Sequence, residues 1–383
     1  MSEHRIHGRA FLRGAIQDDT LITLRDGLIT EVVQVSPRPA NAAGTDGLIV
    51  PGFIDLHIHG GDGADFMDGD VDANARILAF HARNGTTALA ATTLSGSQHD
   101  LKHAVAAITK TKRAAPRGAQ ICAIHLEGPY INLHRAGAQD RPSIRSADIQ
   151  EIASLLEEAP PKFRWIITLA PEIAGAQALI EQYRSRILFS IGHTSADYSE
   201  AVAALGWGAT HFTHLFNAMT GMHHREPGVV GAALVSTDAT AELIADGIHV
   251  HPVVLRIATM TMPNRIALVT DAIRACGLPE GKYRLYDSEV TVVEGAARLN
   301  TGTLAGSVLT MARAVQNMVE LAGLPVHTVI PLATEVPSRI LGVSDRKGKL
   351  DAGYDGDVVV LSPKFAVERV FVAGEPIETD RGS

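Results

Sequence analysis

Histidine and carboxylate residues recur directly after short apolar runs in this sequence. The pattern opens at His57 and His59, which are two residues apart and therefore share one face of an extended segment. The residues that repeat the pattern further along the chain are His125, Glu127, His193, His214, Asp246, His249 and Asp271. Imidazole nitrogens and carboxylate oxygens gathered in one place form the mixed ligand set of a zinc-like site. A metal ion with an open coordination position lowers the pKa of water toward neutrality, so the pattern indicates a hydrolase.

The apolar runs that precede these residues alternate with helix-like segments. Eight such runs cover residues 53–57, 87–91, 122–126, 165–169, 187–191, 209–214, 243–246 and 265–270. Apolar runs that alternate with helices indicate parallel strands covered on both faces. Eight units fit an α/β fold of the (β/α)8 TIM-like barrel type, in which catalytic residues lie at the carboxyl ends of the strands. A doubly wound open sheet is the structural alternative, but no G-x-G-x-x-G motif follows the first run.

The two ends of the chain differ from this middle region. Residues 1–50 and the segments 357–361 and 367–374 contain short strand-like runs separated by turn residues. We therefore expect a small β-sandwich domain made from residues 1–50 plus 345–383. Residues 51–344 are expected to form the metal-dependent barrel that carries the active site.

Composition narrows the classes of partner. The formal net charge of −8 argues against nucleic acid, although one pocket could still be locally basic and accept a phosphorylated small molecule. Only Cys122 and Cys276 are present, which excludes a disulfide framework. The first residues carry charges and lack the apolar core of a signal peptide. No apolar run approaches 18 residues, so we expect a cytoplasmic protein with no membrane partner.

Three residues of the barrel pattern are expected to have specific roles. Asp271 follows the eighth run, where a carboxylate can take a proton from metal-activated water and pass it to a departing amine. Asp271 could also be a metal ligand, a role compatible with that of a base, or it could be the N-cap of a helix that begins with the DAIRAC segment. His125 shares a strand face with Glu127 and is expected to support the ligands, whereas His211 is expected to pack on the other face of its strand.

Several motifs resemble the amidohydrolase superfamily and, within it, the N-acetylglucosamine-6-phosphate deacetylases. They are residues 49–61 (IVPGFIDLHIHGG), 125–130 (HLEGPY), 213–219 (THLFNAM), 225–228 (REPG), 268–272 (LVTDA) and 302–307 (GTLAGS). The resemblance covers nearly the whole chain, including a β-sandwich made from both termini. It implies an amide hydrolase of amino sugar catabolism that converts N-acetyl-D-glucosamine 6-phosphate to D-glucosamine 6-phosphate and acetate.

The resemblance also implies a ligand set. Glu127, His193 and His214 would bind the principal metal ion, and His57 and His59 would bind a second one that Glu127 bridges. Asp271 would lie close to both ions as the catalytic residue. Some relatives lack the second histidine of the first pair and use one metal, whereas this sequence keeps both. One or two divalent ions per subunit are therefore expected, with zinc favoured over iron(II), cobalt or manganese.

Substrate contacts follow from the same resemblance. Asn217, the backbone at Ala218 and the guanidinium of Arg225 would hold the phosphate, since a planar guanidinium matches phosphate oxygens. His249 would contact the sugar or the phosphate. The pocket wall would be shaped by Leu304, Ala305 and Gly306. In this family the arginine segment reaches the site of a neighbouring subunit, which implies a homodimer with Arg225 near the interface.

The sequence departs from the family at one substrate position. After the EGPY segment, many relatives carry Gly-Ala-His, whereas this chain has Gly137, Ala138 and Gln139. A glutamine donates a hydrogen bond but cannot become cationic. The second metal ion is then expected to polarise the acetyl carbonyl more strongly, or the change signals a different sugar epimer.

Three alternative functions stay open at this stage. The nearest is the same reaction on N-acetylgalactosamine 6-phosphate. A wider one is an amidohydrolase that acts on an N-acyl amino acid or a cyclic amide, although Asn217 with Arg225 favours a phosphate. A non-catalytic scaffold with the same barrel is a third, but such a chain is expected to have lost ligands, and this one keeps them all.

Overall fold

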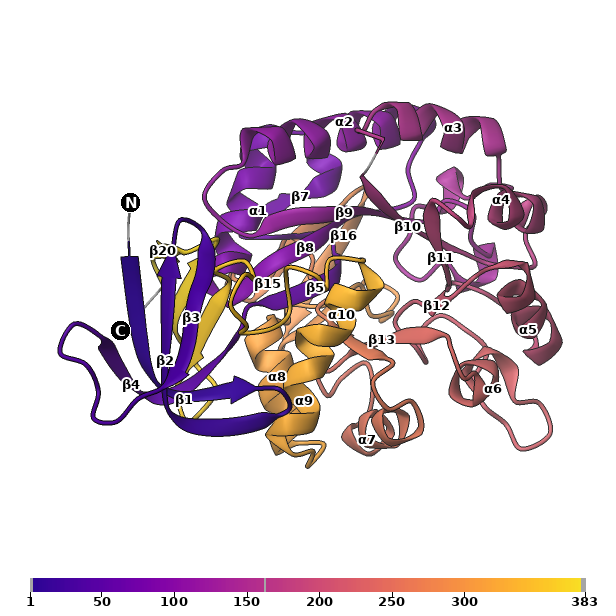
Figure 1. Cartoon of the computed structure of the whole chain (residues 1–383). Coiled ribbons are helices and arrows are strands. Elements are labelled where there is room, and N and C mark those ends of the chain that lie inside the picture. Colours follow the sequence, from indigo (N-terminus) through magenta and orange to yellow (C-terminus); the bar gives the residue numbers. More distant parts are fainter. Residues whose placement is uncertain (1–2, 162, 380–383) are drawn as a thin grey trace.

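A parallel barrel forms the centre of the molecule (Figure 1). The computed structural model describes residues 3–161 and 163–379, so residues 1–2 and 380–383 of the expected terminal domain lie outside the described residues. Eight strands form one sheet in the order β14-β13-β12-β11-β10-β9-β8-β5. They are β5 (Phe53–Ile58), β8 (Thr86–Thr93), β9 (Gln120–Glu127), β10 (Arg164–Leu169), β11 (Ile187–Ile191), β12 (His211–Phe212), β13 (Thr240–Ile244) and β14 (Ile266–Val269). Each of the eight predicted runs overlaps one of these strands.

The barrel closes between its first and last strands. The backbone N–H of Asp271 donates to His57 O over 2.9 Å, and Ile58 forms a parallel bridge with Ala272. Buried Asp55 reinforces the seam, because its carboxylate accepts from the hydroxyl of Thr270 at 2.6 Å. Burial raises the pKa of Asp55 to about 7, against the opposing hydrogen bond from Thr270. The predicted (β/α)8 fold class is confirmed, and the seam places the residues after β5 beside those after β14.

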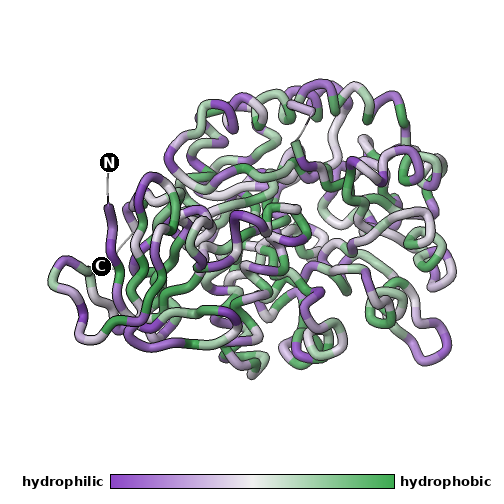
Figure 2. The backbone as a smooth tube through the Cα atoms, viewed as in Figure 1, coloured by the Kyte–Doolittle hydropathy of each residue, from purple (hydrophilic) through white to green (hydrophobic). Residues whose placement is uncertain are grey.

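Helices surround the barrel strands. They are α1 (Val71–Arg83), α2 (Gln98–Ala114), α3 (Ile149–Glu157), α4 (Ala176–Tyr183), α5 (Tyr198–Trp207), α6 (Gly228–Val235), α7 (Pro252–Thr261), α8 (Met311–Glu320), α9 (Val326–Ala333) and α10 (Glu335–Ile340). Figure 2 shows apolar segments along the inner strands, which are buried on both faces as parallel strands require. No helix in the described part of the chain is long and apolar enough to cross a membrane.

Both ends of the chain join in one seven-stranded sheet beside the barrel, seen in Figure 1 as indigo and yellow strands. Its strands are β1 (Glu3–Leu12), β2 (Ala15–Arg25), β3 (Leu28–Gln34), β4 (Ala43–Pro51), β18 (Val358–Leu361), β19 (Val367–Val372) and β20 (Glu375–Ile377). Strand β4 pairs with β1 in parallel and with β18 antiparallel, so it links the two ends. The bounds expected for the terminal domain and for the barrel at 51–344 stay a prediction.

A small antiparallel sheet interrupts the last part of the barrel and was not anticipated from the sequence. Strands β15 (Gly281–Leu285), β16 (Ser288–Val293) and β17 (Ala296–Leu299) lie between β14 and α8. The hydroxyl of Tyr286 donates to Asp100 Oδ2 at 2.7 Å, which fixes this sheet to the first turn of α2. The inserted sheet therefore lies over the same barrel end as the predicted site.

Candidate active site

A cavity of about 480 Å³ opens at the carboxyl end of the barrel. Strand ends and the loops that follow them supply its walls, as expected for a barrel enzyme. The predicted site residues that line it are His59, Glu127, Ala138, Gln139, His193, His214, Asn217, Ala218, His249, Asp271, Leu304 and Gly306. Most of the residues singled out by sequence thus meet in one place.

Glu127 lies at the centre of the histidines. Its Oε1 is 3.0 Å from Nε2 of His193, 3.0 Å from Nε2 of His214 and 3.3 Å from Nε2 of His57. Its Oε2 is 3.2 Å from Nε2 of His59. We call Glu127, His193 and His214 the first subsite, and His57, His59 and Glu127 the second subsite. One carboxylate thus serves both subsites, with Oε1 near His193, His214 and His57 and Oε2 near His59.

The donor set fits a divalent metal ion. The Nε2 atoms of His193 and His214 are 3.0 Å apart, and those of His57 and His59 are 3.2 Å apart. These nitrogens converge with a carboxylate oxygen in a buried space, which suits an ion of the zinc type. His59 and His214 have no hydrogen-bond partner for Nδ1 among the described residues. A proton on Nδ1 leaves the Nε2 lone pair of each ring available to a metal ion.

Asp271 completes the cluster from the last strand. Its Oδ1 is 3.2 Å from Nε2 of His59 and 3.6 Å from Nε2 of His57. Burial opposes ionisation, but the imidazoles of His57 and His59 lower the pKa of Asp271, so the group is a carboxylate at neutral pH. A strand bridge and a turn follow Asp271, with no helix beginning there, so the N-cap alternative is wrong.

Neighbouring imidazoles lower the pKa of Glu127 as they lower that of Asp271. Burial would raise its pKa, but His57 and His193 hold that pKa well below its usual range. Conversely, burial works against protonation of His57, yet Glu127 and Glu242 raise the pKa of that imidazole well above its usual value. The site therefore presents carboxylate oxygens that favour a cation.

Three site residues adopt left-handed backbone conformations just after the ends of their strands. His193, His214 and Asp271 have φ angles of 46°, 29° and 50°. Such conformations cost on the order of 1–3 kcal/mol each in residues other than glycine. Hydrogen bonds compensate at His193, where Nδ1 donates to Arg135 O at 2.8 Å and the carbonyl accepts from Asn132 N at 2.8 Å.

Glu242 is a buried acid of the site that the sequence analysis missed. It lies in β13, one residue before the predicted strand, and is fully buried. Its Oε2 lies 3.0 Å from Nδ1 of His57, and its Oε1 lies 3.3 Å from Nε2 of His211. The expectation that His211 packs on the other strand face is therefore wrong. A carboxylate inside an apolar strand is rare unless it is paired, and this signal could have identified it.

Gln139 contacts the bridging carboxylate directly. Its Oε1 accepts from the backbone N–H of Ser95 at 2.6 Å, which directs its Nε2 as a donor to Glu127 Oε2. His249 is held in a similar way, because its Nδ1 lies 2.6 Å from Asp246 Oδ2. Leu285 and Arg298 of the inserted sheet also line the cavity and were not identified from the sequence.

Three predicted site residues lie outside the cavity walls. His57 and Ala305 are fully buried. Arg225 is exposed on the loop before α6, where its Nη1 lies 2.7 Å from Nε2 of His224, and it does not line the cavity of its own chain. Gly306 does line the wall; its φ is 55°, and a Cβ there would lie 2.8 Å from Asp271 O. Glycine thus allows the wall to approach the backbone of Asp271.

The fold and the site together define the class of protein. The chain belongs to the amidohydrolase family, whose family model matches residues 48–377. Within that family it is 37% identical to the N-acetylglucosamine-6-phosphate deacetylase of Bacillus subtilis (strain 168), over 89% of this chain and 88% of that protein. It is 36% identical to the N-acetylgalactosamine-6-phosphate deacetylase of Escherichia coli O157:H7, over 94% of each chain.

Solved structures give the same result. A substituted form of N-acetyl-D-glucosamine-6-phosphate deacetylase from Mycobacterium smegmatis, in complex with N-acetyl-D-glucosamine-6-phosphate, matches with a TM-score of 0.93 and 35% identity. That match covers 99% of this chain and 100% of the other. The enzyme from Thermotoga maritima matches with a TM-score of 0.88 and 30% identity, covering 98% and 99% of the two chains. The resemblance to the deacetylases is confirmed.

Proposed function

We propose that this chain is an N-acetylglucosamine-6-phosphate deacetylase that releases acetate and D-glucosamine 6-phosphate. The observation that carries the proposal is the convergence of Glu127, four imidazoles and Asp271 in one buried cluster beside the cavity, in a chain similar to deacetylases along almost all of its length. The same convergence argues against the scaffold alternative, because every proposed ligand is in place.

The proposed cofactor is one divalent ion in each subsite, with zinc favoured. Glu127, His193 and His214 would hold the first ion, and His57 and His59 with Glu127 would hold the second. When bound, such ions lower the pKa of water and polarise the acetyl carbonyl. The neutral donor Gln139 beside Glu127 is consistent with leaving that polarisation to the ions.

Asp271 is the proposed proton carrier. The carboxylate faces the cavity and is ionised at neutral pH, so it can accept a proton as water adds to the acetyl carbon. The carbon–nitrogen bond then breaks, and the proton passes from Asp271 to the departing amine. A carbon–oxygen bond replaces the amide bond, which gives acetate and the free amino sugar phosphate.

The substrate contacts are also proposals. Asn217, Ala218 and His249, which would contact the sugar phosphate, line the cavity together with Leu304 and Gly306. The position of Arg225 outside its own cavity is consistent with a phosphate contact in a second subunit, and hence with the expected homodimer. A phosphorylated sugar carries charge that prevents its passage through a bilayer, which supports the expected cytoplasmic location.

Acetate release from defined substrates tests the proposal. The purified protein, with its metal content measured by mass spectrometry, is assayed with N-acetylglucosamine 6-phosphate, its galacto epimer and unphosphorylated N-acetylglucosamine. We expect the highest kcat/KM on the first and a large loss without phosphate. Faster turnover of the galacto epimer would favour the alternative substrate, and no acetate from any metal-loaded sample would favour the scaffold.

A further inference from the structure

Glu242 is a fully buried carboxylate that contacts one residue of each metal subsite. Burial of a charge is costly unless hydrogen bonds compensate for the lost water. Glu242 Oε2 has two such contacts, each of 3.0 Å, to Nδ1 of His57 and to the backbone N of His214. Glu242 thus contacts both subsites. It binds the ring of His57 in the second subsite and the backbone N–H of His214 in the first.

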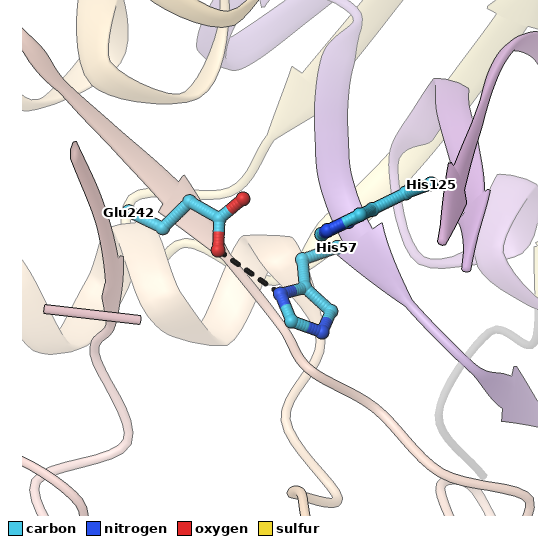
Figure 3. Close-up of side chains that lie close together, drawn as sticks. All are labelled: His57, His125 and Glu242. Carbon is cyan, nitrogen blue, oxygen red and sulfur yellow. Dashed lines mark hydrogen bonds and ion pairs between the residues drawn. The ribbon is translucent and has the colours of Figure 1, made fainter. Parts of the chain in front are cut away.

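The contacts determine where the protons lie. A carboxylate only accepts hydrogen bonds, so Nδ1 of His57 carries a proton and donates it to Glu242, as drawn in Figure 3. The other ring nitrogen, Nε2, faces Glu127 and His59 and is the one left to bind a metal ion. Glu242 therefore selects the form of His57 that is able to bind a metal ion through Nε2.

The neighbouring His125 does not make this group into another metal site. His57, His125 and Glu242 lie close enough together to suggest one. However, His125 Nδ1 donates to Leu56 O at 3.2 Å, and its Nε2 accepts from the hydroxyl of Thr168 at 2.7 Å. Both of its nitrogens are in use, and the cluster supports the ligands above it.

The ligand rings differ in their support. Nδ1 of His193 donates a hydrogen bond to the backbone carbonyl of Arg135. Nδ1 of His59 and Nδ1 of His214 have no hydrogen-bond partner among the described residues. His57 is the ligand whose ring is held by a carboxylate, which also increases the basicity of the coordinating nitrogen. The influence of Glu242 on a ligand ring is therefore specific to the second subsite.

We propose that Glu242 is a positioning residue that sets the metal affinity of the second subsite by fixing the proton and the orientation of His57. This inference rests on the proposed metal-dependent function. Loss of such a supporting carboxylate lowers metal affinity by roughly 10- to 100-fold in known metal sites. The neutral Glu242→Gln variant keeps the shape of the side chain and removes its charge.

Metal titration of the stripped protein separates the possibilities. The parent, Glu242→Gln and Glu242→Leu are titrated with zinc against a chromophoric chelator, and the folding of each is checked by circular dichroism. Asp355→Asn, an acid-to-amide change at a buried position on the other barrel end, is the matched control. We expect two zinc ions in the parent and the control. We expect a second-ion affinity about 10- to 100-fold weaker in Glu242→Gln, with a smaller change for the first ion.

Each contrary result has a distinct meaning. Parental affinity for the second ion in Glu242→Gln, or equal weakening of both ions, overturns the assignment to Glu242 and leaves the proposed function intact. A parent that binds one zinc ion overturns the second subsite itself. A parent that binds none overturns both proposals. If Glu242→Leu does not fold, Glu242→Gln still decides, because its side chain has the same shape as that of the parent.

Discussion

Both ends of the barrel bury carboxylates, but they differ in what lies beside them. At the amino end, Nζ of buried Lys347 is 2.7 Å from Asp355 Oδ2 and 2.6 Å from Asp357 Oδ2. Gly52 N, just before β5, donates to Asp357 O at 2.9 Å, which ties this cluster to the barrel. At the carboxyl end, the ion-pair partners of Glu127 and Asp271 among the described residues are all histidines.

The difference separates a structural cluster from a binding site. The chain provides its own cation at the amino end, so the charges there are compensated within the fold. At the carboxyl end the partners of the carboxylates are imidazoles, which can give up a proton and present a nitrogen lone pair to an added cation. Buried acids alone therefore do not identify an active site; the nature of their partners does.

The largest effect is expected from Asp271→Asn, which removes the proposed proton carrier and keeps the side-chain shape. Loss of a general acid–base group costs about 10²- to 10⁴-fold in rate. We expect kcat to fall by that range, with zinc content and free energy of unfolding close to the parent values. Steady-state acetate release and denaturant unfolding measure the two quantities. Near-normal turnover would contradict the assigned role.

Lys347→Met tests the amino end. The change leaves Asp355 and Asp357 without their buried cation, and breaking such a pair costs about 3–5 kcal/mol. We expect the free energy of unfolding to fall by that amount in urea titrations, while the zinc affinity of the folded protein is unchanged. A variant as stable as the parent would show that the cluster contributes little.

Zinc addition is expected to stabilise the carboxyl end alone. An ion present at 100 times its Kd raises the free energy of unfolding by about 2.7 kcal/mol, if it binds only the folded chain. We expect this gain in the stripped parent and in Lys347→Met, and a reduced gain in His193→Ala, when unfolding is followed with and without zinc. The same gain in His193→Ala would place the stabilising ion elsewhere.

The smallest of these effects is expected from acidification, which should weaken the contribution of the amino-end cluster to the free energy of unfolding. Burial opposes ionisation of Asp355, but its hydrogen bond with Arg346 and the charge of Lys347 lower its pKa. Because the pKa is lower in the folded chain, the stabilisation is complete above the unfolded value of about 4 and is lost as the pH falls through the folded value. We expect the stability difference between the parent and Asp355→Asn to shrink below about pH 4. A constant difference would exclude this origin.

Much of the fold and of the ligand set could be predicted because both follow from local patterns. Apolar runs marked every barrel strand, and residues such as Glu127 and Asp271 followed them at the shared rim. The inserted sheet β15–β17 was not predicted because its strands are short and partly exposed, so they lack the apolar runs that mark the barrel strands. Glu242 was missed because the predicted run began one residue after it, and its partners His57 and His211 are distant in sequence.

Strand β4 has a consequence for how the protein is made. It runs directly through Gly52 into β5, which carries His57, yet one of its edges pairs with β18 near the other end of the chain. During synthesis that edge stays open until residues 358–361 have left the ribosome, long after the barrel strands have been produced. Unpaired strand edges promote association between chains. We therefore expect nascent or truncated chains without β18 to aggregate, even though each metal ligand would already be present.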